Sequence, residues 1–307
     1  MSAAIITSDK VVPMTSGATA APVRAANEAV PVAPPVVAAA PREPRTPVSE
    51  ILLNIFKAVF PPIAGMVLLI AVWALLAGSG GSIPGPLPVW EAAKVLFADP
   101  FYNNGPNDMG IGWNVLSSLQ RVGIGFGFAA LVGIPLGFII GRFAFMNAML
   151  DPIISLLRPV SPLAWLPIGL LVFKQADPAA TWTIFICSIW PMIINTAVGV
   201  QRVPQDYMNV ARVLDLSEWK IVTKILFPSV LPYMLTGIRL SIGTAWLVIV
   251  AAEMLTGGVG IGFWVWDEWN NLKVEHIIIA IFVIGIVGLL LEQFLLLLAR
   301  RFSYGNS

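Results

Sequence analysis

Six apolar segments, most of them long enough to cross a membrane, constrain the fold of this chain more than any other feature. They cover residues 59–78, 114–140, 161–175, 178–199, 229–256 and 275–299. A helix needs about 20 apolar residues to cross a hydrocarbon core of about 30 Å. Hydrophobic residues make up 57% of the chain and charged residues 11%, and the mean hydropathy is +0.83. We therefore expect an all-α, polytopic membrane bundle of about six transmembrane helices.

The third segment, residues 161–175, is the weakest of the six. Its prolines Pro162 and Pro167 favour a short or broken helix. Asp177 and Pro178 then predict a tight turn before the fourth segment. A five-span arrangement, in which residues 161–175 form a re-entrant segment, therefore stays open beside the six-span one.

The lysines and arginines near the segment ends predict the orientation, because cytoplasmic loops carry an excess of positive residues. The residues expected on the cytoplasmic side are Lys10, Arg24, Arg42, Arg45, Lys57, Arg142, Arg158, Arg202, Arg212, Lys220, Lys224, Arg300 and Arg301. The opposite side carries Lys94, Lys174 and Lys273. Both termini and the loop 200–228 are therefore expected in the cytoplasm.

Residues 1–47 differ in composition from the rest of the chain. They are rich in Ala, Val and Pro, and the spacing of the prolines blocks a long helix. We expect a disordered cytoplasmic tail, followed by a membrane domain over residues 48–307. The net charge of +1 indicates no nucleic-acid partner, and the single cysteine, Cys187, offers neither a disulfide framework nor a thiolate metal site.

The loop 200–228 contains a polar, amphipathic element between two membrane segments. Four apolar residues recur at helical spacing, with polar residues on the other side of the predicted helix. The apolar set is Tyr207, Val210, Val213 and Leu214, and the polar set is Gln205, Asp206, Asn209 and Arg212. Such a helix either docks in a groove of a cytoplasmic partner or rests on the lipid surface.

A second short helix is expected to begin near Glu218. Asp215 and Ser217 are candidate caps for it, and Trp219, Val222 and Phe227 would form its apolar side. Asp215 precedes this helix at a turn, where aspartate tolerates a left-handed backbone better than most residues do. A helix–turn–helix element is therefore predicted.

Four ionisable residues lie inside the apolar segments, where a charge is costly and tends to face protein or water. They are Arg121, Arg239, Glu253 and Glu292. Arg239 and Glu292 lie toward the cytoplasmic ends, where snorkelling of their side chains explains them. Arg121 and Glu253 lie toward the outer ends, and two interpretations stay open. They form an ion pair that fixes helix packing, or Arg121 faces a pathway for anions.

Glycines and tryptophans mark two further regions. Gly123, Gly125, Gly127, Gly133, Gly137 and Gly141 favour close packing of the second segment. Between the last two segments, a glycine run from Gly257 to Gly262 leads into an aromatic cluster that includes Trp264 and Trp266. These tryptophans are either interfacial anchors or part of a periplasmic gate.

The loop 200–228 resembles the coupling loop of permease subunits from binding-protein-dependent ABC importers. The family pattern reads Glu-Ala-Ala, three residues, Gly, nine residues, then Ile-x-Leu-Pro. In this register Asn209, Val210 and Asp215 replace the family's Glu, Ala and Gly, and Phe227 replaces Leu. The matching residues are Ala211, Ile225 and Pro228. The resemblance implies that this element, including Asn209, Val210 and Asp215, couples the chain to an ATPase.

The resemblance extends over residues 50–303. Residues 118–122, 133–137, 158–167 and 249–254 look like the nitrate, sulfonate and taurine branch of these permeases. Residues 245–258, which include Trp246, together with 264–271 and 275–278, resemble nitrate permease subunits and their bicarbonate and cyanate relatives. Arg121, Glu253, Trp246, Trp264 and Trp266 are therefore candidates for a translocation path or gate.

The resemblance implies a set of partners in a bacterial inner membrane. Two permease subunits, expected to be identical, would form the pathway among the membrane lipids. Two cytoplasmic ATPases would bind the loops over 205–227, and a periplasmic binding protein would deliver the oxyanion. The chain lacks a Gly-x-x-x-x-Gly-Lys-Ser/Thr sequence, so ATP is expected in the partner subunits, with neither cofactor, metal nor enzymatic activity in this chain.

Nitrate is the expected substrate, and bicarbonate, cyanate and organic sulfonates are the alternatives within the family. An ion-coupled secondary carrier is an alternative of a different class, and it would need titratable groups along its path. A haem-bearing membrane anchor is disfavoured, because His276 is the single histidine of the chain.

Overall fold

A computed structural model of the chain describes residues 48–78, 83–105 and 108–302. The chain divides into two units, Met1–Val59 and Phe60–Ser307. The predicted disordered tail, residues 1–47, lies outside the described residues. The second unit carries every site considered below.

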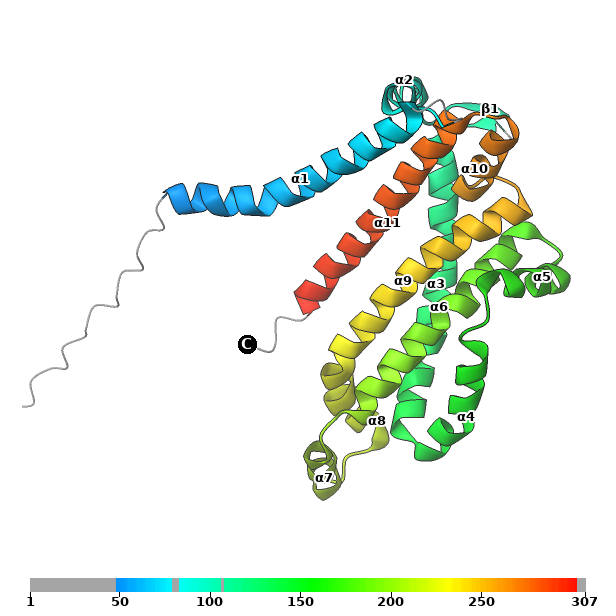
Figure 1. The fold of residues 1–307 in the computed structure, drawn as a ribbon. Helices are drawn as coiled ribbons and strands as arrows, with labels where there is room; N and C mark the ends of the chain where they lie inside the picture. The colour runs from blue at the N-terminus through cyan, green and yellow to red at the C-terminus, as the bar shows by residue number, and fades with distance from the viewer. Residues whose placement is uncertain (1–47, 79–82, 106–107, 303–307) are drawn as a thin grey trace, which may run out of the picture. The chain divides into compact units, whose positions relative to one another are not determined.

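The described residues are almost entirely helical (Figure 1). The first half contains α1 (Val48–Gly78), α2 (Pro86–Leu96), β1 (Asn103–Gly105), β2 (Asp108–Met109), α3 (Ile111–Arg142), α4 (Ala144–Leu157) and α5 (Pro162–Phe173). The second half contains α6 (Ala176–Gln201), α7 (Gln205–Val213), α8 (Glu218–Ile221), the π-helical segment η1 (Val222–Leu226), α9 (Phe227–Thr256), α10 (Ile261–Asn270) and α11 (Val274–Phe302). The two short strands pair antiparallel, with Asn103 opposite Met109.

Within the described residues, five stretches are long and apolar enough to cross a membrane. They are Val59–Gly78, Ile111–Arg142, Ala176–Gln201, Glu218–Thr256 and Val274–Ala299. A sixth crossing exists if α4 and α5 count as one, and this pair is bent by 99°. The all-α bundle with about six spans is confirmed. However, α5 has 12 residues, so the apolar segment 161–175 does not form a full span of its own.

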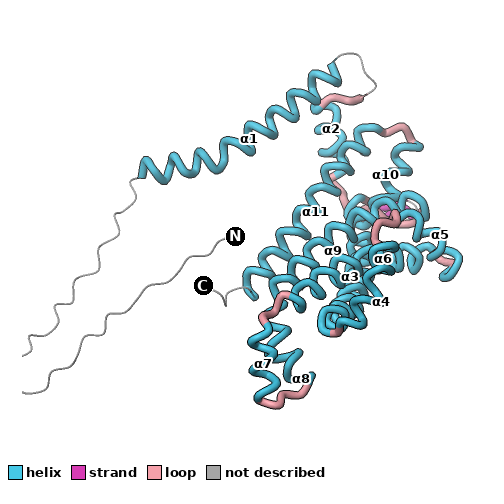
Figure 2. The backbone as a smooth tube through the Cα atoms, turned by 60° about the horizontal axis from the view of Figure 1, so that its bottom comes forward, coloured by secondary structure: helices cyan, strands magenta, loops and turns pink. Residues whose placement is uncertain are grey.

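Helices α3, α6 and α9 run alongside one another in the second unit (Figures 1 and 2). Glycines of α3 make the contact with α6 close. A Cβ atom at Gly137 would lie 2.6 Å from Thr196 Cβ, and one at Gly141 would lie 2.6 Å from Val200 Cβ. Gly125 and Gly133 meet α6 in the same way, whereas Gly123 and Gly127 have open space beside them. The prediction of close glycine packing is therefore confirmed for four of the six glycines.

Hydrogen bonds join α9 to α6 and to α11. Ser241 Oγ donates to the Ser188 carbonyl of α6 at 2.6 Å. Trp246 Nε1 donates to the Ile284 carbonyl of α11 at 2.9 Å. Arg239 of α9 and Glu292 of α11 form an ion pair, and each side chain is about half exposed. The interpretation that these two charges merely snorkel is therefore incomplete, because each has the other as a partner.

Two helices, α2 and α10, lie in regions whose glycines and prolines gave no helix in the sequence analysis. Helix α2 begins at Pro86, a position where proline fits a helix because the first amides have no helical acceptor. Helix α10 follows the glycine run and contains Trp264 and Trp266. In Figure 1, α10 and β1 lie at one end of the second unit, and α7 and α8 lie at the other. These are called the α10 end and the α7 end below.

Candidate functional site

A buried carboxylate organises the α10 end. Glu253 of α9 is 1% exposed. Its two oxygens lie 2.8 Å from the Ser118 hydroxyl of α3, and Oε1 accepts from Arg121 Nη1 at 2.7 Å. Oε2 accepts from the Gly262 amide, in the first turn of α10, at 3.0 Å. Three elements therefore converge on one charge, and a buried charge is tolerated when it is paired and hydrogen-bonded in this way.

The loop between α9 and α10 is attached to α3 through its backbone. The Val259 carbonyl accepts from Arg121 Nη1 at 2.7 Å and from Ser117 Oγ at 3.0 Å. The Gly260 amide donates to Asn114 Oδ1 at 2.9 Å. A Cβ atom at Gly260 would lie 2.3 Å from Glu253 Cδ, so glycine is required for this approach. The glycine run between α9 and α10 is thus held to α3 at several points.

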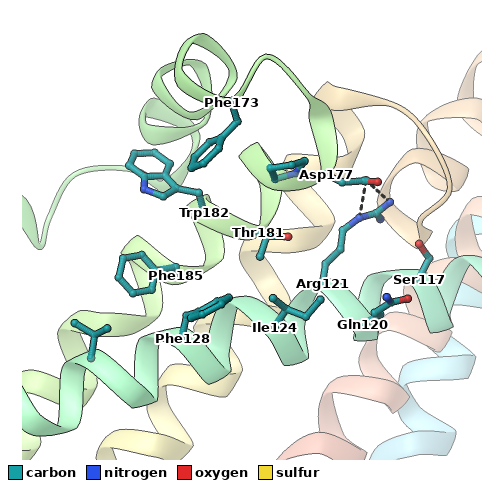
Figure 3. A pocket seen from close by; sticks show the side chains of 12 residues that line it. Ser117, Gln120, Arg121, Ile124, Phe128, Phe173, Asp177, Thr181, Trp182 and Phe185 are labelled. Carbon is teal, nitrogen blue, oxygen red and sulfur yellow. Dashed lines mark hydrogen bonds and ion pairs between the residues drawn. The ribbon is translucent and has the colours of Figure 1, made fainter.

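Arg121 has a second carboxylate partner that the sequence analysis missed. Its Nε and Nη2 donate to Asp177 Oδ1 at 3.0 and 2.7 Å (Figure 3). The Arg121 side chain is 11% exposed, whereas that of Asp177 is 72% exposed. The ion pair of Arg121 with Glu253, one of the two interpretations from the sequence, is present. Asp177 and Pro178 were predicted to form a turn before the fourth segment, and both residues instead lie in the first turn of α6.

Two cavities adjoin the Arg121–Asp177 pair. The larger, of about 600 Å³, extends between α3, α5 and α6 along mostly apolar and aromatic side chains (Figure 3). Its lining includes Gln120, Phe128, Phe173, Thr181, Trp182 and Phe185. The smaller, of about 390 Å³, is lined on its other side by Gln175, Ala176 and residues 256–259. Ser117, Arg121, Asp177 and Pro178 line both cavities.

The three candidate tryptophans do not line the two cavities beside Arg121. Trp246 is buried between α9 and α11. Trp264 is buried in α10 and stacks on His276, with ring centroids 5.8 Å apart. Trp266 is 44% exposed. The structure therefore brings Arg121 and Glu253 together and leaves the tryptophans elsewhere, so their role in a gate stays a prediction.

At the α7 end, the predicted helix–turn–helix element packs on its own chain through Ala211, Ile221 and Leu226. Ala211 is fully buried, beside Met208 and a cluster that includes Val203, Ile221 and Leu226. Asp215 has φ of 46°, the left-handed turn that was predicted. Helix α8 begins at Glu218 with Ser217 at its N-cap position, as predicted, but the Ser217 side chain makes no capping hydrogen bond.

The predicted apolar face of α7 points away from this cluster. Tyr207, Val210, Val213 and Leu214 are all more than half exposed, with Val213 reaching 86%. Asn209 and Pro228 are also exposed, and Ile225 is half-buried. A contiguous exposed apolar surface at the end of a membrane protein is typical of a partner or lipid contact.

An ion pair and an aromatic stack connect the helix–turn–helix element and the start of α9 to α3. Arg142, at the end of α3, donates to both carboxylate oxygens of Glu218 in α8, at 2.9 and 3.3 Å. Phe138 of α3 stacks on Phe227, the first residue of α9, with ring centroids 6.4 Å apart. Movement of α8 would therefore reach α3 directly as well as through η1 into α9.

Comparison with known proteins identifies the family to which the chain belongs. Residues 133–304 match the family model of the binding-protein-dependent transport system inner membrane component. The chain is 49% identical to the nitrate import permease protein NrtB of Synechocystis sp., over 83% of this chain and 92% of that protein. It is 46% identical to the bicarbonate transport system permease protein CmpB of Synechococcus elongatus, over 78% of this chain and 87% of that one.

A solved structure supports the fold. The MetNI methionine ABC transporter, in an inward-facing conformation, contains a chain that matches 62% of this chain and 94% of its own length, with a TM-score of 0.54. The sequences share 14% identity, so this likeness concerns the fold alone.

Proposed function

Because the chain belongs to the family of inner membrane components of binding-protein-dependent transport systems, we propose that it is the permease subunit of an ATP-driven importer that carries nitrate. The observation that carries this proposal is the identity of 49% to a nitrate import permease, which covers 83% of this chain. Bicarbonate is the second candidate, because a bicarbonate permease is 46% identical. Both anions are small, planar and singly charged.

In this proposal the chain is a non-catalytic subunit. ATP binds to two partner subunits and is hydrolysed there, and a second copy of the chain completes the pathway. The α7 end faces the cytoplasm together with both termini, and the α10 end receives the periplasmic binding protein. The positive residues of the α7 end, such as Arg202, Lys220 and Lys224, support this orientation.

The exposed apolar surface of α7 is the proposed contact for the ATPase. Ala211 fixes α7 on the bundle, while Val210, Val213 and Leu214 remain free to enter a groove of the partner. A displacement of α7 and α8 by the ATPase would be transmitted to α3 through the Arg142–Glu218 ion pair and to α9 through η1. Since α3, α6 and α9 pack closely, they would transmit the motion to the α10 end as a unit.

Replacing Leu214 by glutamate tests this docking surface. Burying a leucine side chain contributes about 1.5–3 kcal/mol, so its loss should weaken ATPase binding by about ten- to a hundredfold. The measurement is the amount of ATPase that co-purifies with the permease over a range of protein concentrations. Leu272→Glu is the matched control, because Leu272 is 80% exposed and follows α10 at the opposite end. Equal retention of ATPase by both variants would contradict the docking role.

The substrate is tested by uptake in a strain that lacks the gene, with and without the gene restored. Restored uptake of labelled nitrate at low external concentration, abolished when ATP is depleted but retained with an uncoupler at constant ATP, is the expected result. The same result also excludes an ion-coupled secondary carrier. Restored uptake of labelled bicarbonate or cyanate in place of nitrate would reassign the substrate.

A further inference from the structure

The two carboxylates around Arg121 are held in very different ways. Glu253 is buried, and its oxygens accept from Arg121, Ser118 and the Gly262 amide. Asp177 is 72% exposed, and its hydrogen bonds in the described structure go to Arg121. An exposed ion pair is weak, because water competes for both partners, whereas a buried pair is costly to break. Asp177 is therefore the partner that can leave Arg121.

The two edges of the Arg121 guanidinium are divided between these partners. Nη1 is engaged by Glu253 and the Val259 carbonyl, which fix the group on the α10 end. Nε and Nη2, which together form the edge that fits a planar oxyanion, are engaged by one oxygen of Asp177. When Asp177 leaves, this edge becomes free while the guanidinium stays in place.

The pair also lies at the junction of two cavities. Arg121 and Asp177 line both the cavity of about 390 Å³ beside the α9–α10 loop and the cavity of about 600 Å³ between α3, α5 and α6. One positive charge there faces two carboxylates, so an arriving anion meets excess negative charge until Asp177 moves away.

We propose that Asp177 is a displaceable counter-ion that closes the junction between the two cavities, and that the freed Nε–Nη2 edge of Arg121 binds the carried oxyanion. The proposal rests on the proposed function for the class of substrate. It assigns a role to Asp177, which occupies the place that an oxygen atom of nitrate or bicarbonate would take. The anion would exchange with Asp177, bind Arg121 in a bidentate manner, and then pass into the larger cavity.

Thiol labelling tests the closure without transport. Thr181 lines the larger cavity and not the smaller one (Figure 3). In the assembled importer, with Cys187 replaced by alanine, a Thr181→Cys variant is labelled from the α10 end by anionic sulfonatoethyl methanethiosulfonate. Asp177→Asn should raise the labelling rate about tenfold by removing one nearby negative charge. Asp177→Glu, which keeps the charge, should leave the rate close to that of the parent.

Added anions test the oxyanion site in the same assay. In the Asp177→Asn complex, nitrate or bicarbonate should slow the labelling of Thr181→Cys, whereas gluconate at equal ionic strength should not. If Asp177→Asn leaves the labelling rate of Thr181→Cys unchanged, Asp177 does not close the junction. If Asp177→Glu raises the labelling rate as much as Asp177→Asn does, the charge of Asp177 is not what closes it. If nitrate, bicarbonate and gluconate change the labelling rate equally, the proposal that Arg121 binds the oxyanion is overturned. Protection by bicarbonate and not by nitrate would uphold the site while contradicting nitrate as the substrate.

Discussion

Replacing Glu253 by alanine should destabilise the permease by about 3–5 kcal/mol, the usual result of breaking a buried ion pair by removing one partner. The variant leaves Arg121 Nη1 without its carboxylate and removes the acceptor of the Gly262 amide. The Ser118 hydroxyl also loses Glu253 as a partner and keeps the Asn114 carbonyl as its acceptor. The first turn of α10 then loses this hydrogen bond to α9. We expect a lower thermal-unfolding midpoint of the purified importer and a poor yield of assembled complex.

Glu218→Ala is the matched control for Glu253→Ala. Glu218 is also paired with an arginine across two helices, but its side chain is 61% exposed. Exposed ion pairs contribute about 0–1 kcal/mol, so this variant should unfold near the midpoint of the parent. A similar loss in both variants would show that the burial of Glu253 is not the cause.

Replacing Gly137 by alanine should destabilise the bundle by about 1–3 kcal/mol, because the added methyl group overpacks the contact of α3 with α6. Its Cβ atom would lie 2.6 Å from Thr196 Cβ and 2.8 Å from the Ile193 carbonyl oxygen. The carbonyl belongs to the backbone of α6 and cannot rotate away, so the two helices must move apart. Thermal unfolding of the purified permease measures the loss.

Gly127→Ala on the same helix should not destabilise the bundle. A Cβ atom at Gly127 would meet no atom within 4 Å. Alanine in the middle of a helix is favoured over glycine by about 0.5–1 kcal/mol, so this variant should be neutral or slightly more stable. If both variants lower the midpoint equally, the close contact with α6 is not what requires glycine at position 137.

The sequence predicted those features that depend on length, periodicity or local chemistry. Apolar segments of about 20 residues predicted the spans, since the membrane fixes the required length. The cost of a charge in hydrocarbon led to the Arg121–Glu253 ion pair as one of two interpretations. The left-handed turn at Asp215 followed from the family's glycine at that position together with the tolerance of aspartate.

Features that depend on a distant partner were missed. Asp177 was interpreted as part of a turn, because the sequence does not show that the first turn of α6 lies against Arg121 of α3. The periodicity of α7 identified its apolar residues but not which of them would contact the bundle. Ala211 makes that contact, and the larger residues beside it remain exposed.

Uptake of labelled nitrate into proteoliposomes that contain the complete importer tests the proposed function most directly. The permease, its ATPase and the binding protein are purified and reconstituted, with ATP supplied on the side of the ATPase. We predict nitrate accumulation that requires ATP hydrolysis and the binding protein, and that falls when Leu214→Glu weakens docking of the ATPase. Nitrate uptake that proceeds without ATP, or no nitrate uptake by an assembled complex that hydrolyses ATP and imports another anion, would contradict it.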